Sequence, residues 1–381
     1  MAYDQESFLA GIATGRNMKS WPSFEFTGGR VWAFTIELES DSLSFVAPIH
    51  VMGSEETASR GLTVYWGDGS VSVIRQKNIG AVPHDYEVAG TYTVAIFGIP
   101  ENGYLDRSSA NSFRKSLVRL HTPIPLTGAI PTEHPETLRQ AFLGTFDYDR
   151  VSIFGPKIVE IDSDLLNAQR NRGEVEFQLD LMFSGCRSLE IVPDDLFEGI
   201  DFSLYEGTYG NPPIQAMFSG CTSLTKIGNI FNNPCFRDVI SIYNIFGNCE
   251  SLSDIPGDLF SEMVNLQGAG RAFRNCKSLR TIPRNLFSYS DSLYAFADCF
   301  NGCVNLRSIP DSLFDNITDS EDLNFRYCFD GCSGITGAVP DLWNRFPLCT
   351  KHEWCFSGCI NAANYEDIPY SWGGPLNGNR L

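Results

Sequence analysis

Twelve cysteines are the residues of this 381-residue sequence best suited to redox or metal chemistry, so their spacing is the first question. Seven of them recur at intervals of 35, 28, 27, 27, 29 and 27 residues: Cys186, Cys221, Cys249, Cys276, Cys303, Cys332 and Cys359. Three copies carry another cysteine four residues earlier, where the other copies hold Met182, Met217, Ile245 and Ala272. That position therefore accepts any apolar side chain. The pattern favours reduced thiols that fill a core, with disulfides second and a metal site last.

Histidines and carboxylates are the next candidates for catalytic groups. Of five histidines, only His352 lies close to a cysteine, three residues before Cys355. Paired acids could serve a glycoside hydrolase or bind calcium, but acidic loops are more simply a solvated surface. These acids are Asp194, Asp195, Asp311, Asp315, Asp319, Glu321 and Asp322. No phosphate-binding loop, nucleophile elbow or zinc-protease motif occurs. We therefore predict a protein that is not an enzyme, with no catalytic residue, metal site or cofactor.

The seven cysteines belong to a longer repeat, F-x-G/N-C-x-S/N-L-x-x-I-P-x-x-L-F. It is clear at residues 246–260, 273–287 and 300–314, and looser at 183–197, 218–231, 329–343 and 356–372. A unit of this length cannot bury its own apolar face, so the copies must stack into a solenoid. Leu-x-x-Ile followed by Pro predicts a short strand that the proline ends, with a helical or irregular return.

One position in each repeat is a candidate for ligand binding. The residue after the Leu of Leu-x-x-Ile changes from copy to copy while its neighbours stay nearly constant, and stacking should align it into one exposed column. The six residues are Glu190, Thr225, Ser253, Arg280, Arg307 and Thr336. A column of varied chemistry is typical of a surface that reads a ligand, although exposed positions also drift without selection.

Residues 26–108 have a different pattern, typical of an all-β domain. Residues 31–38 alternate as a strand does, and residues 62–66 and 71–74 should form a hairpin around the turn Gly67-Asp68-Gly69. Asp68 is interpreted as closing that turn through backbone amides. His84 is interpreted as a packed, hydrogen-bonded side chain. Neither residue is expected to be catalytic.

Composition narrows the possible partners. Asp and Glu outnumber Lys and Arg by 46 to 28, for a net charge of −18, which argues against nucleic acid and anionic membrane. No run of 18 apolar residues is present, so no membrane insertion is expected. The N-terminus also lacks the basic and apolar regions of a secretory signal.

Three resemblances follow from these motifs. The repeat resembles the leucine-rich repeats of BspA-type bacterial surface proteins. The sequence W-G-D-G, followed by H-x-Y-x-x-x-G-T-Y-T-V, resembles the PKD domain, an immunoglobulin-like β-sandwich. The opening F-L-A-G-I-A-T-G-R is similar to the leader of phage and prophage structural proteins, although an arm packed on the next domain explains it equally well.

Together these observations predict a mixed α/β chain, in which a PKD-like antiparallel β-sandwich precedes a leucine-rich-repeat solenoid. The expected parts are an attachment arm (1–25), the sandwich (26–108), degenerate capping repeats (109–180) and the solenoid with its C-terminal cap (181–381).

The function expected is that of a phage virion protein, such as a fibre or decoration protein. It would be made in the host cytoplasm, would bind other virion proteins through its N-terminal region, and would bind a host surface protein or glycan through the repeats. Self-association is left open. The alternatives are a bacterial cell-surface adhesin and, behind it, a carbohydrate hydrolase.

Overall fold

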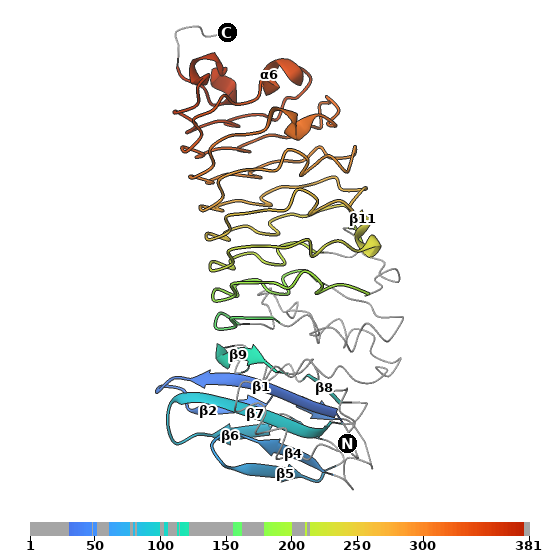
Figure 1. Cartoon of the computed structure of the whole chain (residues 1–381), viewed down its shortest axis with the longest axis vertical. Coiled ribbons are helices and arrows are strands. Elements are labelled where there is room, and N and C mark those ends of the chain that lie inside the picture. The colour runs from blue at the N-terminus through green and yellow to red at the C-terminus, as the bar shows by residue number, and fades with distance from the viewer. Residues whose placement is uncertain are drawn as a thin grey trace.

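The computed structural model describes residues 30–47, 49–51, 61–76, 79–80, 82–99, 103–105, 113, 115–121, 155–161, 179–199, 210–211 and 214–376. Figure 1 shows the sheets at one end of an elongated molecule, with the repeats stacked one above another toward the C-terminal end. The expected attachment arm (1–25) and most of the expected capping region (109–180) lie outside the described residues.

The N-terminal part is built from antiparallel strands. β5 (Val71–Ile74), β4 (Leu62–Tyr65), β7 (Gly90–Ile99), β1 (Arg30–Leu38) and β9 (Leu117–Leu120) form a five-stranded sheet in that order. Two further pairs join β2 (Ser44–Ala47) to β6 (Val82–Asp85) and β3 (Ile49–Val51) to β8 (Gly103–Leu105). The strand predicted at 31–38 and the β4–β5 hairpin are confirmed.

Aromatic side chains hold the small β2–β6 sheet against the large one. The ring centroids of Phe34 on β1 and Phe45 on β2 lie 6.0 Å apart, and the Phe113 ring contacts both. Trp32 and Trp66 are also fully buried in this core. In the β4–β5 turn, Gly67 has a φ of +87°, and a Cβ there would meet the Thr93 carbonyl oxygen at 2.7 Å. Only glycine therefore fits between this turn and β7.

The repeats lie one on another and form the repeat stack, which comprises residues 179–199 and 214–376. Each repeat contributes one segment to one side of the stack, and this side is called the Phe–Cys wall. The segment begins about five residues before the first Phe of the repeat motif and ends two residues after the Leu of Leu-x-x-Ile. In the third repeat this is Ser241 to Asp254, and each end makes a single parallel bridge to a neighbouring repeat. Between the bridges, backbone N–H groups such as those of Phe246 and Ser253 donate to carbonyls of adjacent repeats. The wall is therefore hydrogen-bonded from repeat to repeat.

A ladder of aromatic rings runs up the inside of this wall. Phe183, Phe218, Phe246, Phe273, Phe300, Phe329 and Phe356 stack face to face, with centroids 5.3–5.7 Å apart. A second ladder joins Phe197, Phe231, Phe260 and Phe287 at 6.2–6.4 Å. All these rings are buried, so each repeat completes the core of the next.

The seven repeat cysteines form a parallel ladder of thiols. From Cys221 onward, each Sγ–H donates to the carbonyl oxygen of the Phe in the preceding repeat, at 3.1–3.3 Å. All twelve cysteines are free, and the seven in the ladder are fully buried. The prediction that these thiols fill the core is therefore confirmed, and cysteine suits the position because it is small, apolar and still a donor.

The predicted fold class, mixed α/β with a leucine-rich-repeat solenoid, is wrong. Among the described residues, the repeats contain turns and isolated bridges in place of the strand expected at Leu-x-x-Ile, and the extended sheets of the chain are antiparallel. Helix in the stack is limited to short pieces: η2 (Pro234–Phe236), η3 (Asp311–Phe314), α6 (Leu342–Arg345), η4 (Tyr365–Asp367) and η5 (Tyr370–Trp372). A two-residue antiparallel pair, β10 (Gly210–Asn211) with β11 (Asp238–Val239), completes the elements.

Backbone conformation explains why the Phe–Cys wall is not a continuous sheet. Each repeat places a left-handed residue two positions before its Phe and another two positions after it, for example Asn244 and Asn248 around Phe246. A strand needs consecutive residues in the β region, so these two positions reduce the ladder to single bridges. On the return side, only seven residues separate Phe260 from the bridge at Gly268, which is too short for a stable helix.

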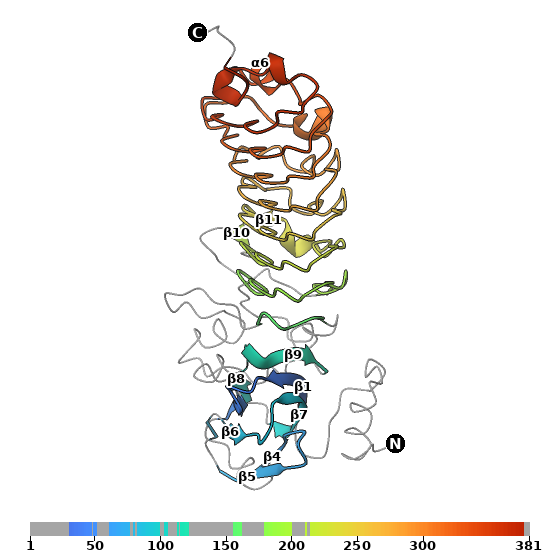
Figure 2. The same cartoon turned by 90° about the vertical axis from the view of Figure 1, so that its left-hand side faces the viewer.

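Residues 155–161 join the sheets to the stack. The Val159 N–H donates to the Val118 carbonyl of β9 at 3.2 Å, and the Val159 carbonyl accepts from Glu190 of the first repeat at 3.4 Å. Lys157 forms ion pairs with Glu37 and Glu39 at the end of β1, at 3.0 and 2.7 Å. Both views show β9 facing the stack (Figures 1 and 2). The sheet edge is thus covered, and the first repeat has a partner.

The opposite end of the stack is closed by Trp372. Its ring stacks on Phe356 with centroids 6.4 Å apart, and its carbonyl accepts from the Phe356 N–H at 2.7 Å. Trp372 therefore covers the last ring of the ladder, and its ring also stacks on His352 with centroids 4.5 Å apart. Gly373, with a φ of +101°, follows it because a Cβ there would meet the Ser357 nitrogen at 2.4 Å.

We predict that the thiol ladder contributes measurably to stability. Cys276→Ala removes the Sγ–H donor to Phe246 and leaves a small void, which should cost about 1–2 kcal/mol in urea denaturation. Cys276→Asp should cost more, since it buries an unpaired charge. Cys235→Ala, at a half-buried cysteine outside the ladder, is the control. Wild-type unfolding midpoints for both Cys276 variants would contradict the role of the ladder.

Candidate functional site

The six residues predicted to form a column lie at one exposed position of successive repeats, and backbone hydrogen bonds join them in two groups of three. The Thr225 N–H donates to the Glu190 carbonyl, and the Ser253 N–H donates to the Thr225 carbonyl, both at 3.2 Å. Higher in the stack, Arg307 donates to Arg280 at 3.0 Å and Thr336 donates to Arg307 at 3.1 Å. Each of the six is exposed: Glu190, Thr225, Ser253, Arg280, Arg307 and Thr336.

Burial on either side fixes the direction of the column. The residue before each column position is a fully buried Leu or Ile, as at Leu252 and Leu279. The next buried residue comes two positions after the column residue, as at Ile255 and Ile282, or three positions after it at Thr336. The chain therefore presents the column side chain outward between two anchored positions. Because the backbone groups already bond from repeat to repeat, the side chains are what the column offers to a ligand.

The buried thiols are not available as nucleophiles. Desolvation raises the pKa of the Cys303 thiol to about 12 and raises that of Cys276 well above its usual value. The pair His352 and Cys355 is no exception. His352 stacks on Trp372 at 4.5 Å, while Cys355 is fully buried with its pKa raised mainly by desolvation. A reactive cysteine needs the opposite environment.

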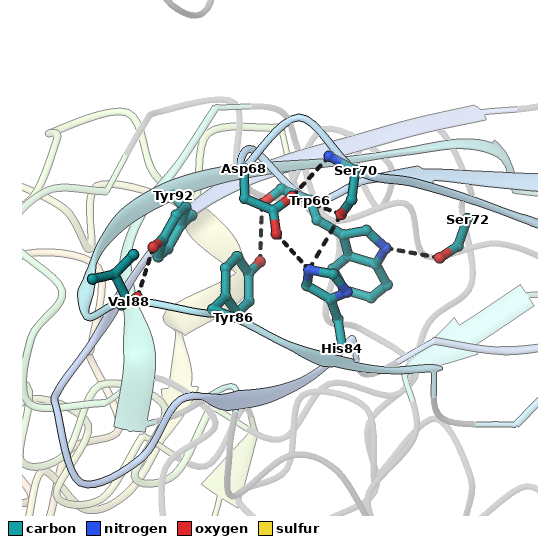
Figure 3. A network of polar contacts seen from close by, with 8 residues as sticks. All are labelled: Trp66, Asp68, Ser70, Ser72, His84, Tyr86, Val88 and Tyr92. Carbon is teal, nitrogen blue, oxygen red and sulfur yellow. Dashed lines mark hydrogen bonds and ion pairs between the residues drawn. The ribbon is translucent and has the colours of Figure 1, made fainter.

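A second polar cluster lies on the sheets, around the β4–β5 turn (Figure 3). An Asp68 carboxylate oxygen lies 2.7 Å from His84 Nε2, and the other accepts from the Ser70 hydroxyl at 2.6 Å and the Ser70 N–H at 2.9 Å. The His84 ring stacks on Trp66 with centroids 4.5 Å apart. The Tyr86 hydroxyl donates to the Trp66 carbonyl at 2.9 Å.

Although Ser, His and Asp meet here, their geometry is not that of a catalytic triad. In a triad, serine and aspartate bind opposite nitrogens of the imidazole. Here Ser70 and Asp68 both approach His84 Nε2, at 3.3 and 2.7 Å, and the serine proton is given directly to the aspartate. The predictions that Asp68 closes the turn and that His84 is packed are confirmed.

The turn should lose stability in acid. Burial raises the pKa of Asp68, but hydrogen bonds from Ser70 and His84 outweigh that effect and lower it to about 2. The carboxylate therefore contributes stability that is complete above its unfolded pKa of about 4 and is lost as the pH falls toward 2. Thermal melts of wild type and Asp68→Asn should differ at pH 6 and converge near pH 2. An equal difference at both pH values would contradict this.

The acidic loops that could have served hydrolysis have other partners. Asp315 forms an ion pair with Arg345 at 2.9 Å, and Asp319 accepts from the Leu348 N–H at 3.1 Å. Asp322 lies 3.8 Å from Lys351. Across the part of the chain that the structure describes, no group of three or more His, Cys, Asp and Glu residues is placed to hold a metal ion.

A second exposed edge of the Phe–Cys wall was not predicted from the sequence. The residue two positions before each Phe has a left-handed backbone, and in the last two repeats it is aromatic: Tyr327 (φ +55°) and Trp354 (φ +60°). Both are about 40% exposed, and Trp354 contacts the exposed Tyr370 at 5.8 Å. Beside them, Arg326 and Glu353 form a two-point ion pair at 2.7 and 2.8 Å. Comparing this position across the copies would have revealed it as a second variable column.

The left-handed conformation gives a clear prediction for Tyr327. At most sites glycine is less stable than alanine, but glycine adopts positive φ without the steric cost that Cβ imposes. Tyr327→Gly should therefore be more stable than Tyr327→Ala, by about 1 kcal/mol in urea denaturation. The same pair at Thr336, whose φ is not positive, should show the reverse order. Alanine matching or exceeding glycine at position 327 would contradict the backbone assignment.

Comparisons with known proteins add no relative. No family model matches this chain, and no curated protein matches it in sequence. Within the described ranges, none of the helices combines the length and the apolar character needed to span a membrane.

Proposed function

We propose that this chain is a non-enzymatic structural protein of a phage virion, which presents the exposed column to the host surface. The column is the observation that carries the proposal: six side chains of differing chemistry stand at one exposed position, each directly after a fully buried Leu or Ile. Repeated, stacked units commonly use such a surface for binding.

The state of the thiols supports assembly inside a cell. Twelve free cysteines, most of them fully buried, suit folding in a reducing cytoplasm. A phage protein folds there and reaches the exterior by lysis. In this proposal the N-terminal region binds other virion proteins, and the repeat stack points away from the particle.

Two alternatives share some of this support. A bacterial surface adhesin would use the same column from the cell envelope. A carbohydrate hydrolase is less well supported, since Asp315 and Asp322 are engaged in ion pairs.

Localisation separates these proposals. Particles and cell fractions from the source culture should be purified and the protein quantified in each by mass spectrometry. We expect it to co-sediment with particles, and the recombinant protein to bind host cells. Enrichment in the cell envelope would favour the adhesin. A pool confined to the cytosol, with no particle and no cell binding, would end the proposal.

A further inference from the structure

Two arginines of the column are neighbours of like charge. Arg280 and Arg307 occupy the same position in adjacent repeats, joined by the backbone hydrogen bond from Arg307 N–H to the Arg280 carbonyl at 3.0 Å. Both side chains are exposed. The Phe rings of the same two repeats, Phe273 and Phe300, stack at 5.4 Å, so successive column positions are separated by about one such step.

Five other basic side chains of the stack are paired with acids of adjacent repeats. The ion pairs among its described residues all join adjacent repeats with complementary charge, at 2.7–3.8 Å. They are Arg271–Asp298, Lys277–Glu250, Arg326–Glu353, Arg345–Asp315 and Lys351–Asp322. By contrast, neither Arg280 nor Arg307 has a side-chain ion pair or hydrogen bond among the described residues.

Packing does not account for the choice of arginine at these two positions. Like charges in register destabilise neighbouring chains, and an exposed position makes no demand for arginine. Repulsion would be relieved by an anion between the two guanidinium groups, whose planar donors bind carboxylates and similar oxyanions at two points. The pair is therefore complementary to an acidic ligand, in a chain whose net charge of −18 disfavours general anion binding.

The other residues of the column indicate which class of acidic ligand fits the arginine pair. Ser253 and Thr336, the column residues before and after the arginine pair, are both exposed. The Ser253 hydroxyl donates to the Thr225 carbonyl at 3.3 Å, so toward a ligand it acts as an acceptor. The column places one residue in each successive repeat, so an extended polysaccharide lying along it can bring successive sugars to successive column residues. Hydroxyl and guanidinium groups in that order suit a chain that carries both hydroxyls and acidic groups.

We propose that Arg280 and Arg307 bind the acidic groups of a host-surface glycan that runs along the column, with Ser253 and Thr336 contacting the neighbouring sugars. This inference rests on the proposed function, because it names the ligand class of that same column. The glycan is recognised by its acidic substituent and by its register with the repeats.

The test uses the full chain and three acidic oligosaccharides, bearing uronate, sialate or sulfate groups, each paired with a neutral counterpart. Calorimetric titration should show binding to at least one acidic probe, weaker binding at higher salt, and none to its neutral partner. Arg280→Ala with Arg307→Ala should lower that affinity at least tenfold while melting no earlier than wild type, since both side chains are exposed.

The matched control is Arg187→Ala with Lys226→Ala. It removes the same charge from exposed positions on the Phe–Cys wall in the first two repeats, and it should leave the affinity unchanged. Equal losses in both double variants would show a general charge effect and overturn the site, as would failure of every acidic probe or equal binding of a neutral one.

Host-cell binding by the same proteins separates this inference from the proposed function. Binding that survives the loss of both arginines would overturn the acidic-glycan site and leave the host-binding function intact. Absence of host binding by wild type would overturn the function itself.

Discussion

The stacking of one phenylalanine per repeat sets the distance from each repeat to the next, and most other contacts depend on that distance. With rings 5.3–5.7 Å apart, backbone N–H groups of the wall reach the carbonyls of adjacent repeats, and each ladder thiol reaches the Phe carbonyl before it. Ion pairs also span a single step, as between Lys277 and Glu250. A larger side chain in the ladder would therefore disturb several kinds of interaction together.

The groups that hold the repeats together are also different from the side chains that a ligand can contact. Backbone polar groups and buried side chains are consumed in holding the repeats together, so the exposed column can change without loss of the fold. The aromatic edge at Tyr327 and Trp354 is different, because a left-handed backbone carries bulky side chains there at some steric cost. Its residues are constrained by the turn as well as by whatever they contact.

The positions of the thiols, of the column residues and of Asp68 could be predicted from the sequence, because each follows from a short local pattern. The repeat register placed the thiols in one core and the six column residues in one exposed row, because both follow from stacking units of nearly equal length. The turn role of Asp68 followed from the glycines beside it. The fold class failed because Leu-x-x-Ile-Pro was interpreted as a strand. Residues such as Arg271 and Asp298 give no sequence signal for the left-handed conformation that interrupts the bridges.

Each end of the repeat stack is specialised. One end meets β9 through residues 155–161, and the other is closed by Trp372. New units can therefore be gained or lost only between these ends, where an inserted copy meets surfaces like its own. Internal duplication of about 27 residues would lengthen the molecule by roughly one ring-stacking step and add one residue to the exposed column. The reach of the protein and the number of positions that it presents are thus tied together, and evolution can adjust both through copy number.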